Sequence, residues 1–138
     1  CYASIHGNTK HAVCHFADDL KAEGHKVKLI DLTREHVSEA VEKCFQYGTI
    51  VLASVTYDGC LMPAMEDLLY HLECKNFQNR RVGLIENGSW GPVAAKKMRE
   101  HLEKMKDIEI CEQVVTIKTT RKEADQAAWD ALKEQILA

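Results

Sequence analysis

The stretch Ser4-Ile5-His6-Gly7-Asn8-Thr9 is short and polar, and it stands between an apolar run, Cys1-Tyr2-Ala3, and apolar residues at helical spacing that start near Asn8. In an α/β protein, such a strand–loop–helix junction can bind a phosphate group. The glycine lets the backbone come close, and the helix amino terminus offers free N–H groups and a positive dipole. The same residues are equally compatible with a plain strand-to-helix turn in which Asn8 or Thr9 caps the helix.

The glycine spacing of this stretch narrows the class of phosphate ligand. A Walker loop carries a lysine after its second glycine, and a dinucleotide fingerprint carries three glycines. Residues 4–9 contain one glycine and neither lysine nor arginine. We therefore predict that the stretch binds a monophosphate through neutral donors.

Strand-like and helix-like patterns alternate along the whole chain. The strand-like segments are residues 1–3, 27–32, 49–54, 82–85 and 108–117. Two helix-like segments run from Asn8 to a cap at Gly24 and from Val37 to Gly48. Three more begin at Pro63, at Pro92 and at the capping-box match Thr120-Arg121-Lys122-Glu123. Five β-α units in succession predict an α/β fold, a doubly wound parallel sheet with helices on both faces, in a single domain of residues 1–138.

The composition excludes several classes of protein. At 138 residues, with 46% hydrophobic and 28% charged residues, the chain fits one folded domain and is not expected to be disordered. A net charge of −3 gives no reason to expect nucleic acid or an anionic membrane as a partner, and the apolar runs are too short to cross a bilayer. The six cysteines stand well apart, unlike those of a zinc site or a redox dithiol. We expect reduced, mostly buried thiols in a cytoplasmic protein.

The expected first strand is unusually short. Cys1-Tyr2-Ala3 provides only three residues before the polar stretch. A strand at the centre of a doubly wound sheet is normally longer, because it makes core contacts on both faces. We therefore expect the natural polypeptide to have residues before Cys1.

Two further loops carry the features of a binding site. In an open α/β sheet, ligands bind beyond the carboxyl ends of the strands near the switch point, so the loops after the first, third and fourth strands should converge. The second of these loops begins Val55-Thr56-Tyr57-Asp58-Gly59, and the third is Asn87-Gly88-Ser89-Trp90-Gly91. Taken singly, Tyr57 is better explained as a loop anchor and Trp90 as a cover of the core. Glycines and aromatics at all three loops together favour a slot for a flat, flavin-like ring.

These residues resemble the flavodoxin-like domain of flavodiiron proteins, also called A-type flavoproteins. The resemblance rests on Tyr2-Ala3-Ser4-Ile5-His6-Gly7-Asn8-Thr9, Ser54-Val55-Thr56-Tyr57-Asp58 and Gly88-Ser89-Trp90-Gly91, and it covers nearly all of the chain. It implies a flavodoxin-like five-stranded parallel sheet in the order 2-1-3-4-5, with FMN as the cofactor. It also implies that Ser4, Gly7, Asn8 and Thr9 hold the FMN phosphate. Thr56, Tyr57, Gly88, Ser89 and Trp90 would then surround the isoalloxazine ring.

The chain departs from the family pattern at His6, Val55 and Asp58. The carboxylate of Asp58 would repel the negative charge of the reduced flavin and so lower its reduction potential. We predict that Asp58→Asn raises the midpoint potential of the FMN-bound protein, and an unchanged or lower potential would contradict this hypothesis. His6 is expected to be an ordinary loop histidine, and Cys60 a packed small side chain instead of a catalytic thiol.

The family resemblance implies an electron-transfer module in which no side chain acts as acid, base or nucleophile. The domain would be the C-terminal part of a larger chain and would pass electrons to a diiron centre on an upstream domain that reduces dioxygen or nitric oxide. Its partner would be that diiron domain or a rubredoxin-like protein, and the full-length protein could form a homo-oligomer. The histidines of this chain show no metal-ligand spacing with carboxylates, so we expect no metal site here.

Two other functions share this order of elements. One is a stand-alone flavodoxin-like NAD(P)H:quinone reductase, which would bleach its flavin rapidly with a nicotinamide cofactor. The other is a flavin-free receiver-like domain, which needs acidic residues where this chain has Ser4 and Ser54. The second is therefore disfavoured.

Overall fold

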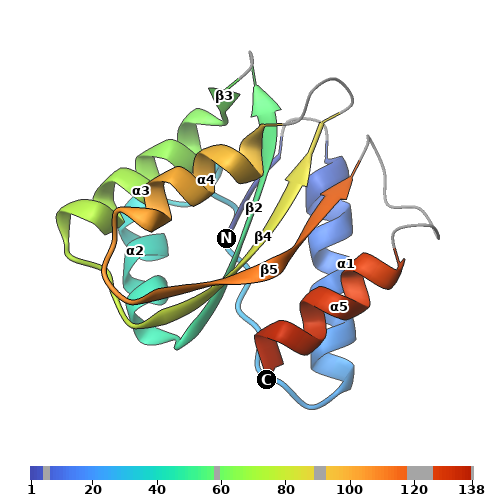
Figure 1. The fold of residues 1–138 in the computed structure, drawn as a ribbon. Helices are drawn as coiled ribbons and strands as arrows, with labels where there is room; N and C mark the ends of the chain where they lie inside the picture. Colours follow the sequence, from blue (N-terminus) through green and yellow to red (C-terminus); the bar gives the residue numbers. More distant parts are fainter. Residues whose placement is uncertain (5–6, 58–59, 89–92, 118–125, 138) are drawn as a thin grey trace.

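The computed structural model describes residues 1–4, 7–57, 60–88, 93–117 and 126–137. This part of the chain forms five helices and five strands, which Figure 1 shows in their arrangement. The elements are β1 (Tyr2–Ala3), α1 (Asn8–Ala22), α2 (Val37–Gln46), β2 (Thr49–Tyr57), β3 (Cys60–Leu61), α3 (Pro63–Cys74), β4 (Arg80–Asn87), α4 (Ala94–Glu103), β5 (Ile108–Ile117) and α5 (Gln126–Leu137).

The strands form one sheet in the order β1-β2-β4-β5, and all of these neighbours are parallel. The registers place Tyr2 opposite Ala53 and Leu52 opposite Leu84. The short strand β3 lies outside this path and pairs antiparallel with the end of β2. The predicted parallel sheet is confirmed, and β3 is an addition that the sequence analysis missed.

The segment 27–32, predicted as a strand, is only partly one. Tyr2 forms a parallel bridge with Asp31, its N–H donates to the Ile30 carbonyl at 3.0 Å, and the Leu32 N–H donates to the Tyr2 carbonyl at 2.9 Å. The segment therefore lies beside β1 at the edge, which gives the predicted order 2-1-3-4-5 in the numbering of the five predicted strands. A longer ladder does not form because β1 itself is only two residues long.

Helices cover both faces of the sheet. In Figure 1, α1 and α5 lie on one side, and α2, α3 and α4 lie on the other. The first layer packs a core that includes Phe16, Ile85 and Trp129. The second layer packs a separate core that includes Met65 and Met98. Helices on both faces of the sheet confirm the predicted doubly wound arrangement. A sheet that is buried on both faces needs apolar residues in succession along its strands.

The helix ends agree with the sequence in part. Gly24 has φ 91°, as predicted for a left-handed cap after α1, and Pro63 is the first residue of α3. The predicted capping of α1 by Asn8 or Thr9 is wrong, because Gly7 occupies the N-cap position and Asn8 begins the helix. Pro92 and the capping-box match at 120–123 lie outside the described residues. Among the helices that the structure describes, none is long and apolar enough to span a membrane.

The prediction of mostly buried thiols is wrong. Cys44 and Cys111 are buried, Cys1 and Cys14 are half-buried, and Cys60 and Cys74 are exposed. Cys60 lies on β3 and is exposed, whereas Leu61 beside it on the same strand is buried. The prediction that Cys60 is a packed small side chain is therefore also wrong.

Candidate functional site

The three predicted loops start at one edge of the sheet. Ser4 follows β1, residues 55–57 end β2, and Gly88 follows β4. Because these strands are parallel neighbours, their carboxyl ends lie together at the upper edge in Figure 1. Ile5, His6, Asp58, Gly59, Ser89, Trp90 and Gly91 also belong to the predicted site, but they lie outside the described residues.

A buried hydrogen bond connects the first loop to the third. The Asn87 side-chain amide donates to the Thr9 hydroxyl across 3.2 Å, and both side chains are buried. Thr9 is the second residue of α1 and Asn87 is the last residue of β4. The bond therefore holds the amino terminus of α1 against the carboxyl end of β4, and the Thr9 hydroxyl hydrogen is still able to donate to another group.

The start of α1 has the features of an anion site. Gly7 has φ 85°, its N–H donates to the Ser4 hydroxyl oxygen at 3.1 Å, and its carbonyl accepts the first helical hydrogen bond from His11. The N-cap residue Gly7 offers no side-chain cap, and the first turn of α1 carries no acidic residue. Because the dipole at a helix amino terminus favours negative charge, the start of α1 is a candidate anion site.

Gly7 is required for its backbone conformation and not for space. A Cβ built on Gly7 would have no atom of another residue within 4 Å, so the position is open. The left-handed φ is unfavourable for residues that carry a Cβ. Glycine is therefore favoured at this position only because of the left-handed backbone conformation.

The second predicted loop is mostly strand. Val55, Thr56 and Tyr57 belong to β2, which extends three residues past the predicted end, and Tyr57 pairs with Cys60 of β3. Their assignment to a loop was wrong. The dipeptide Asp58-Gly59 between two strand-like segments is a strong hairpin signal that could have shown this from the sequence.

Thr56 has a structural partner that its sequence context did not reveal. Its hydroxyl oxygen accepts hydrogen bonds from the N–H of Val93 at 2.9 Å and of Ala94 at 3.2 Å. These are the N-cap residue and the first residue of α4, the helix that follows the third loop. Thr56 therefore caps α4 from the neighbouring strand and fixes the point at which the third loop ends.

Glu86 is a buried acidic residue of β4 that the sequence analysis missed, and it is only 6% exposed. Burial raises the pKa of Glu86 above its ordinary value of 4.5, and the backbone N–H of Ala95 partly offsets this. A charged residue inside the apolar run of β4 was the available signal, because glutamate is seldom buried without a partner.

We expect the stability of the protein to respond to the ionisation of Glu86. The folded protein keeps the Glu86 proton to a higher pH than the unfolded chain does. The wild type should therefore lose stability as the pH rises above about 4.5, and this loss should end once the pH exceeds the pKa of Glu86 in the folded state. Glu86→Gln keeps the shape of the side chain and cannot ionise. Its Tm relative to the wild type should therefore rise between pH 4 and pH 8. Thermal unfolding across this range tests the prediction, with Glu42→Gln on the exposed face of α2 as the control; a constant difference for Glu86→Gln would contradict it.

The described residues include no group of three or more His, Cys, Asp or Glu side chains placed to hold a metal ion. The ring nitrogens of His101 on α4 lie 2.6 Å from a Glu73 carboxylate oxygen and 3.2 Å from one of Glu66, both on α3. These contacts connect α4 to α3.

Comparisons with known proteins agree on the fold. No protein-family model and no curated protein matches the sequence. Among solved structures, rubredoxin oxygen:oxidoreductase from Desulfovibrio gigas superimposes with a TM-score of 0.89 at 21% identity, over 98% of this chain and 33% of that one. Flavodoxin 1 from Bacillus cereus gives 0.83 at 18% identity, over 99% and 94%. The flavodiiron protein from Giardia intestinalis gives 0.81 at 17% identity, over 97% and 34%.

These similarities show that the chain has the flavodoxin-like fold, as the sequence resemblance predicted. The chain spans about a third of the length of the rubredoxin oxygen:oxidoreductase and of the Giardia protein, and nearly the whole of the flavodoxin.

Proposed function

We propose that residues 1–138 form an FMN-binding electron-transfer domain. The observation that carries this proposal is the convergence of the three loops, joined by the Asn87–Thr9 hydrogen bond, at the carboxyl edge of a flavodoxin-like sheet. That edge is where α/β proteins of this topology bind their ligands. FMN would supply the redox chemistry, since it exchanges one or two electrons, and the protein would hold and orient it.

The start of α1 fits the FMN phosphate. Its uncapped N–H groups, the Ser4 hydroxyl and the Asn8 side chain offer neutral donors, and no acidic side chain in the first turn opposes the anion. Val55–Tyr57 and Asn87-Gly88 would form the two sides of the ring site, with residues 58–59 and 89–91 completing it. Thr56 also accepts hydrogen bonds from the N–H groups at the start of α4 and so fixes the end of the third loop.

Titration of FMN with the purified, flavin-free protein tests the proposal. We expect quenching of FMN fluorescence that saturates at one FMN per chain, with a changed visible spectrum. A folded protein that leaves both signals unchanged would instead favour the flavin-free receiver-like domain.

We propose that the electrons pass to a diiron centre on an upstream domain of the same polypeptide, or are exchanged with a rubredoxin-like protein. The support is the match to about a third of two longer proteins, one titled a rubredoxin oxygen:oxidoreductase and the other a flavodiiron protein. In this assignment dioxygen or nitric oxide is the final electron acceptor. The full-length protein works in a reducing cytoplasm. It is a homo-oligomer if the flavin and the diiron centre meet across subunits. Iron content and gas consumption of the full-length natural protein test it.

A stand-alone electron carrier is the second candidate, favoured by the nearly complete match to flavodoxin 1. A stand-alone NAD(P)H:quinone reductase is the third. Anaerobic mixing of the FMN-loaded domain with NADH or NADPH distinguishes them. Rapid bleaching favours the reductase, while a flavin that is bleached only by an added protein donor favours an electron-transfer domain or carrier.

A further inference from the structure

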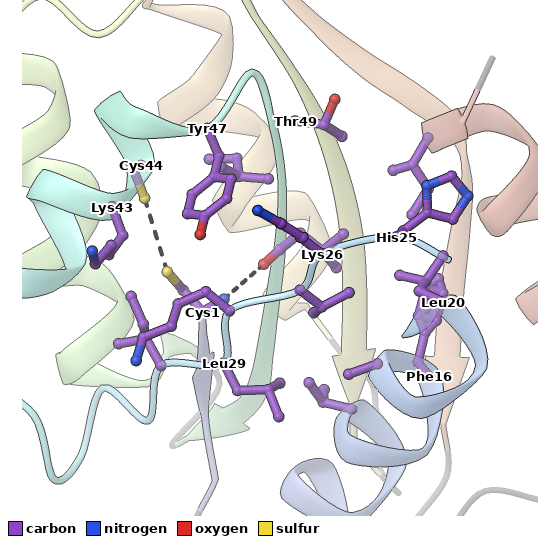
Figure 2. Close-up of a pocket in the computed structure, with 18 of the residues that line it drawn as sticks. Cys1, Phe16, Leu20, His25, Lys26, Leu29, Lys43, Cys44, Tyr47 and Thr49 are labelled. Carbon is purple, nitrogen blue, oxygen red and sulfur yellow. Dashed lines mark hydrogen bonds between the residues drawn. The ribbon is translucent and has the colours of Figure 1, made fainter. Parts of the chain in front are cut away.

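Two cysteine sulfurs are in contact inside the protein. The Sγ atoms of Cys1 and Cys44 lie 3.9 Å apart, and Figure 2 shows them facing each other. The two residues are separated by 43 positions in the sequence, so their spacing gave no sign of a dithiol. Among the residues that the structure describes, no other two cysteine sulfurs make such a contact. The fold thus brings together two thiols that stand well apart in the sequence.

The packing of α2 on the sheet holds the two thiols in place. Cys1 stands directly before β1, and its carbonyl accepts a hydrogen bond from the Ala53 N–H of β2 at 3.0 Å. Cys44 lies in the last turn of α2, where the Arg80 guanidinium donates to the Phe45 carbonyl at 2.9 Å. Cys44 belongs to the core under α2, α3 and α4, and Cys1 packs against that core. The contact between the sulfurs is therefore part of the folded core.

A short movement would turn this contact into a covalent bond. The sulfurs of a disulfide are about 2.05 Å apart, so the two Sγ atoms would have to approach by just under 2 Å. Side-chain rotation and a small shift of the end of α2 can supply this, because the last turn of a helix is held by fewer hydrogen bonds than its middle. The pair can therefore form a disulfide without refolding.

The two thiols differ in their access to an oxidant. Cys1 is half-buried and Cys44 is buried, and both line a cavity of about 310 Å³ (Figure 2). Burial raises the pKa of the Cys44 thiol, and the positive charges of the chain's amino group and of Arg80 offset this only in part. A protonated, buried thiol reacts slowly with an oxidant on its own. Cys1 is thus placed to react first, with Cys44 as the thiol that resolves the product.

We propose that Cys1 and Cys44 form an oxidation site, at which a peroxide converts the two thiols to a disulfide that joins the start of β1 to α2. With hydrogen peroxide, the Cys1 thiol becomes a sulfenic acid and one water leaves. The Cys44 sulfur then attacks the sulfenic sulfur, and a second water leaves as the S–S bond forms. The two thiols lose two electrons and two protons, which reduce the peroxide to two waters. A dithiol reductant reverses the modification by thiol–disulfide exchange.

The bond would close a loop that contains α1 and most of α2. A cross-link between residues 43 positions apart removes much of the conformational freedom of the unfolded chain. Oxidation should therefore raise the Tm by several degrees, and reduction with dithiothreitol should return it to its starting value. The modification is a reversible cross-link within the first third of the chain.

Oxidation of the flavin-free Cys60→Ser/Cys74→Ser variant tests the proposal, because this variant lacks the two exposed thiols that could join one molecule to another. After treatment with hydrogen peroxide, thiol titration of the unfolded protein should find two thiols in place of four. Digestion should release two peptides joined through Cys1 and Cys44, lighter by two hydrogens than the free pair. The Tm should rise, and dithiothreitol should reverse all three changes.

Two variants in the same background serve as controls. Cys44→Ala should form no disulfide, and its Tm should not rise with peroxide. Cys111→Ala removes a buried thiol elsewhere in the fold, and it should form the Cys1–Cys44 bond as the parent variant does.

Three outcomes would overturn the proposal. The first is four remaining thiols and no linked peptides after oxidation. The second is a bond from Cys1 or Cys44 to Cys14 or Cys111. The third is a Cys1–Cys44 bond that lowers the Tm, since such a bond would form only by distorting the fold. None of these measurements involves FMN, so they stand or fall independently of the proposed function.

Discussion

Gly7→Ala is expected to weaken FMN binding by about ten-fold. Gly7 has φ 85°, and an L-residue with a Cβ pays roughly 1–2 kcal/mol in this left-handed region, while 1.4 kcal/mol corresponds to a factor of ten in affinity. The Cβ meets no other residue within 4 Å, so the effect comes from the backbone alone. Relief of the strain would turn the N–H groups at the start of α1 away from the phosphate. Fluorescence titration with FMN measures the change.

Two matched variants control this prediction. Gly7→Asn should bind FMN better than Gly7→Ala, because asparagine tolerates the left-handed region. Gly48→Ala introduces a methyl group into a similarly open position without a positive φ, and it should bind FMN as the wild type does. Wild-type affinity in Gly7→Ala would show that the turn does not position the ligand.

Thr56→Val is expected to weaken FMN binding by up to about ten-fold and to lower stability by ~1 kcal/mol, the usual effect of losing a helix cap. Valine has nearly the shape of threonine but no acceptor for the N–H groups of Val93 and Ala94, which lie 2.9 and 3.2 Å from the hydroxyl oxygen. The start of α4 would shift, and the third loop ends there. Urea unfolding of the flavin-free protein and FMN titration give the two effects separately.

Thr56→Ser is the matched control, since it retains the hydroxyl group. It should keep most of the FMN affinity and of the stability. If the serine and valine variants were equally impaired, the methyl group and not the cap would be the important feature. An affinity loss in Thr56→Val without any loss of stability would instead indicate direct contact between the hydroxyl and the ligand.

Most of the fold could be predicted from hydrophobic patterns. The residues Ile50 to Ala53 are apolar without interruption, as is typical of a strand buried on both faces, and β2 is the strand between β1 and β4. The prediction of a full strand at 27–32 failed because strand pairing depends on the neighbour, and β1 offers only two residues. The pairing of β2 with β3 was missed because Val55 and the residues after it were assigned to a binding loop.

The site could be predicted at the level of loops but not of individual contacts. The positions after β1 and β4 follow from the order of elements, so the placement of Ser4 and Gly88 at the carboxyl edge of the sheet could be predicted. The capping of α4 by Thr56 was not predicted, because it depends on where a helix that follows residues 89–92 begins. The exposure of Cys60 was not predicted either, since the strand β3 that carries it was missed.

The most direct test of the central claim is equilibrium titration of the flavin-free protein with FMN, followed by fluorescence and visible absorbance, with riboflavin as the comparison ligand. We predict saturable binding of one FMN per chain and much weaker binding of riboflavin, which lacks the phosphate that the start of α1 would hold. No binding of FMN by the folded protein would contradict the account, and equal binding of the two flavins would contradict the role of Ser4 to Thr9.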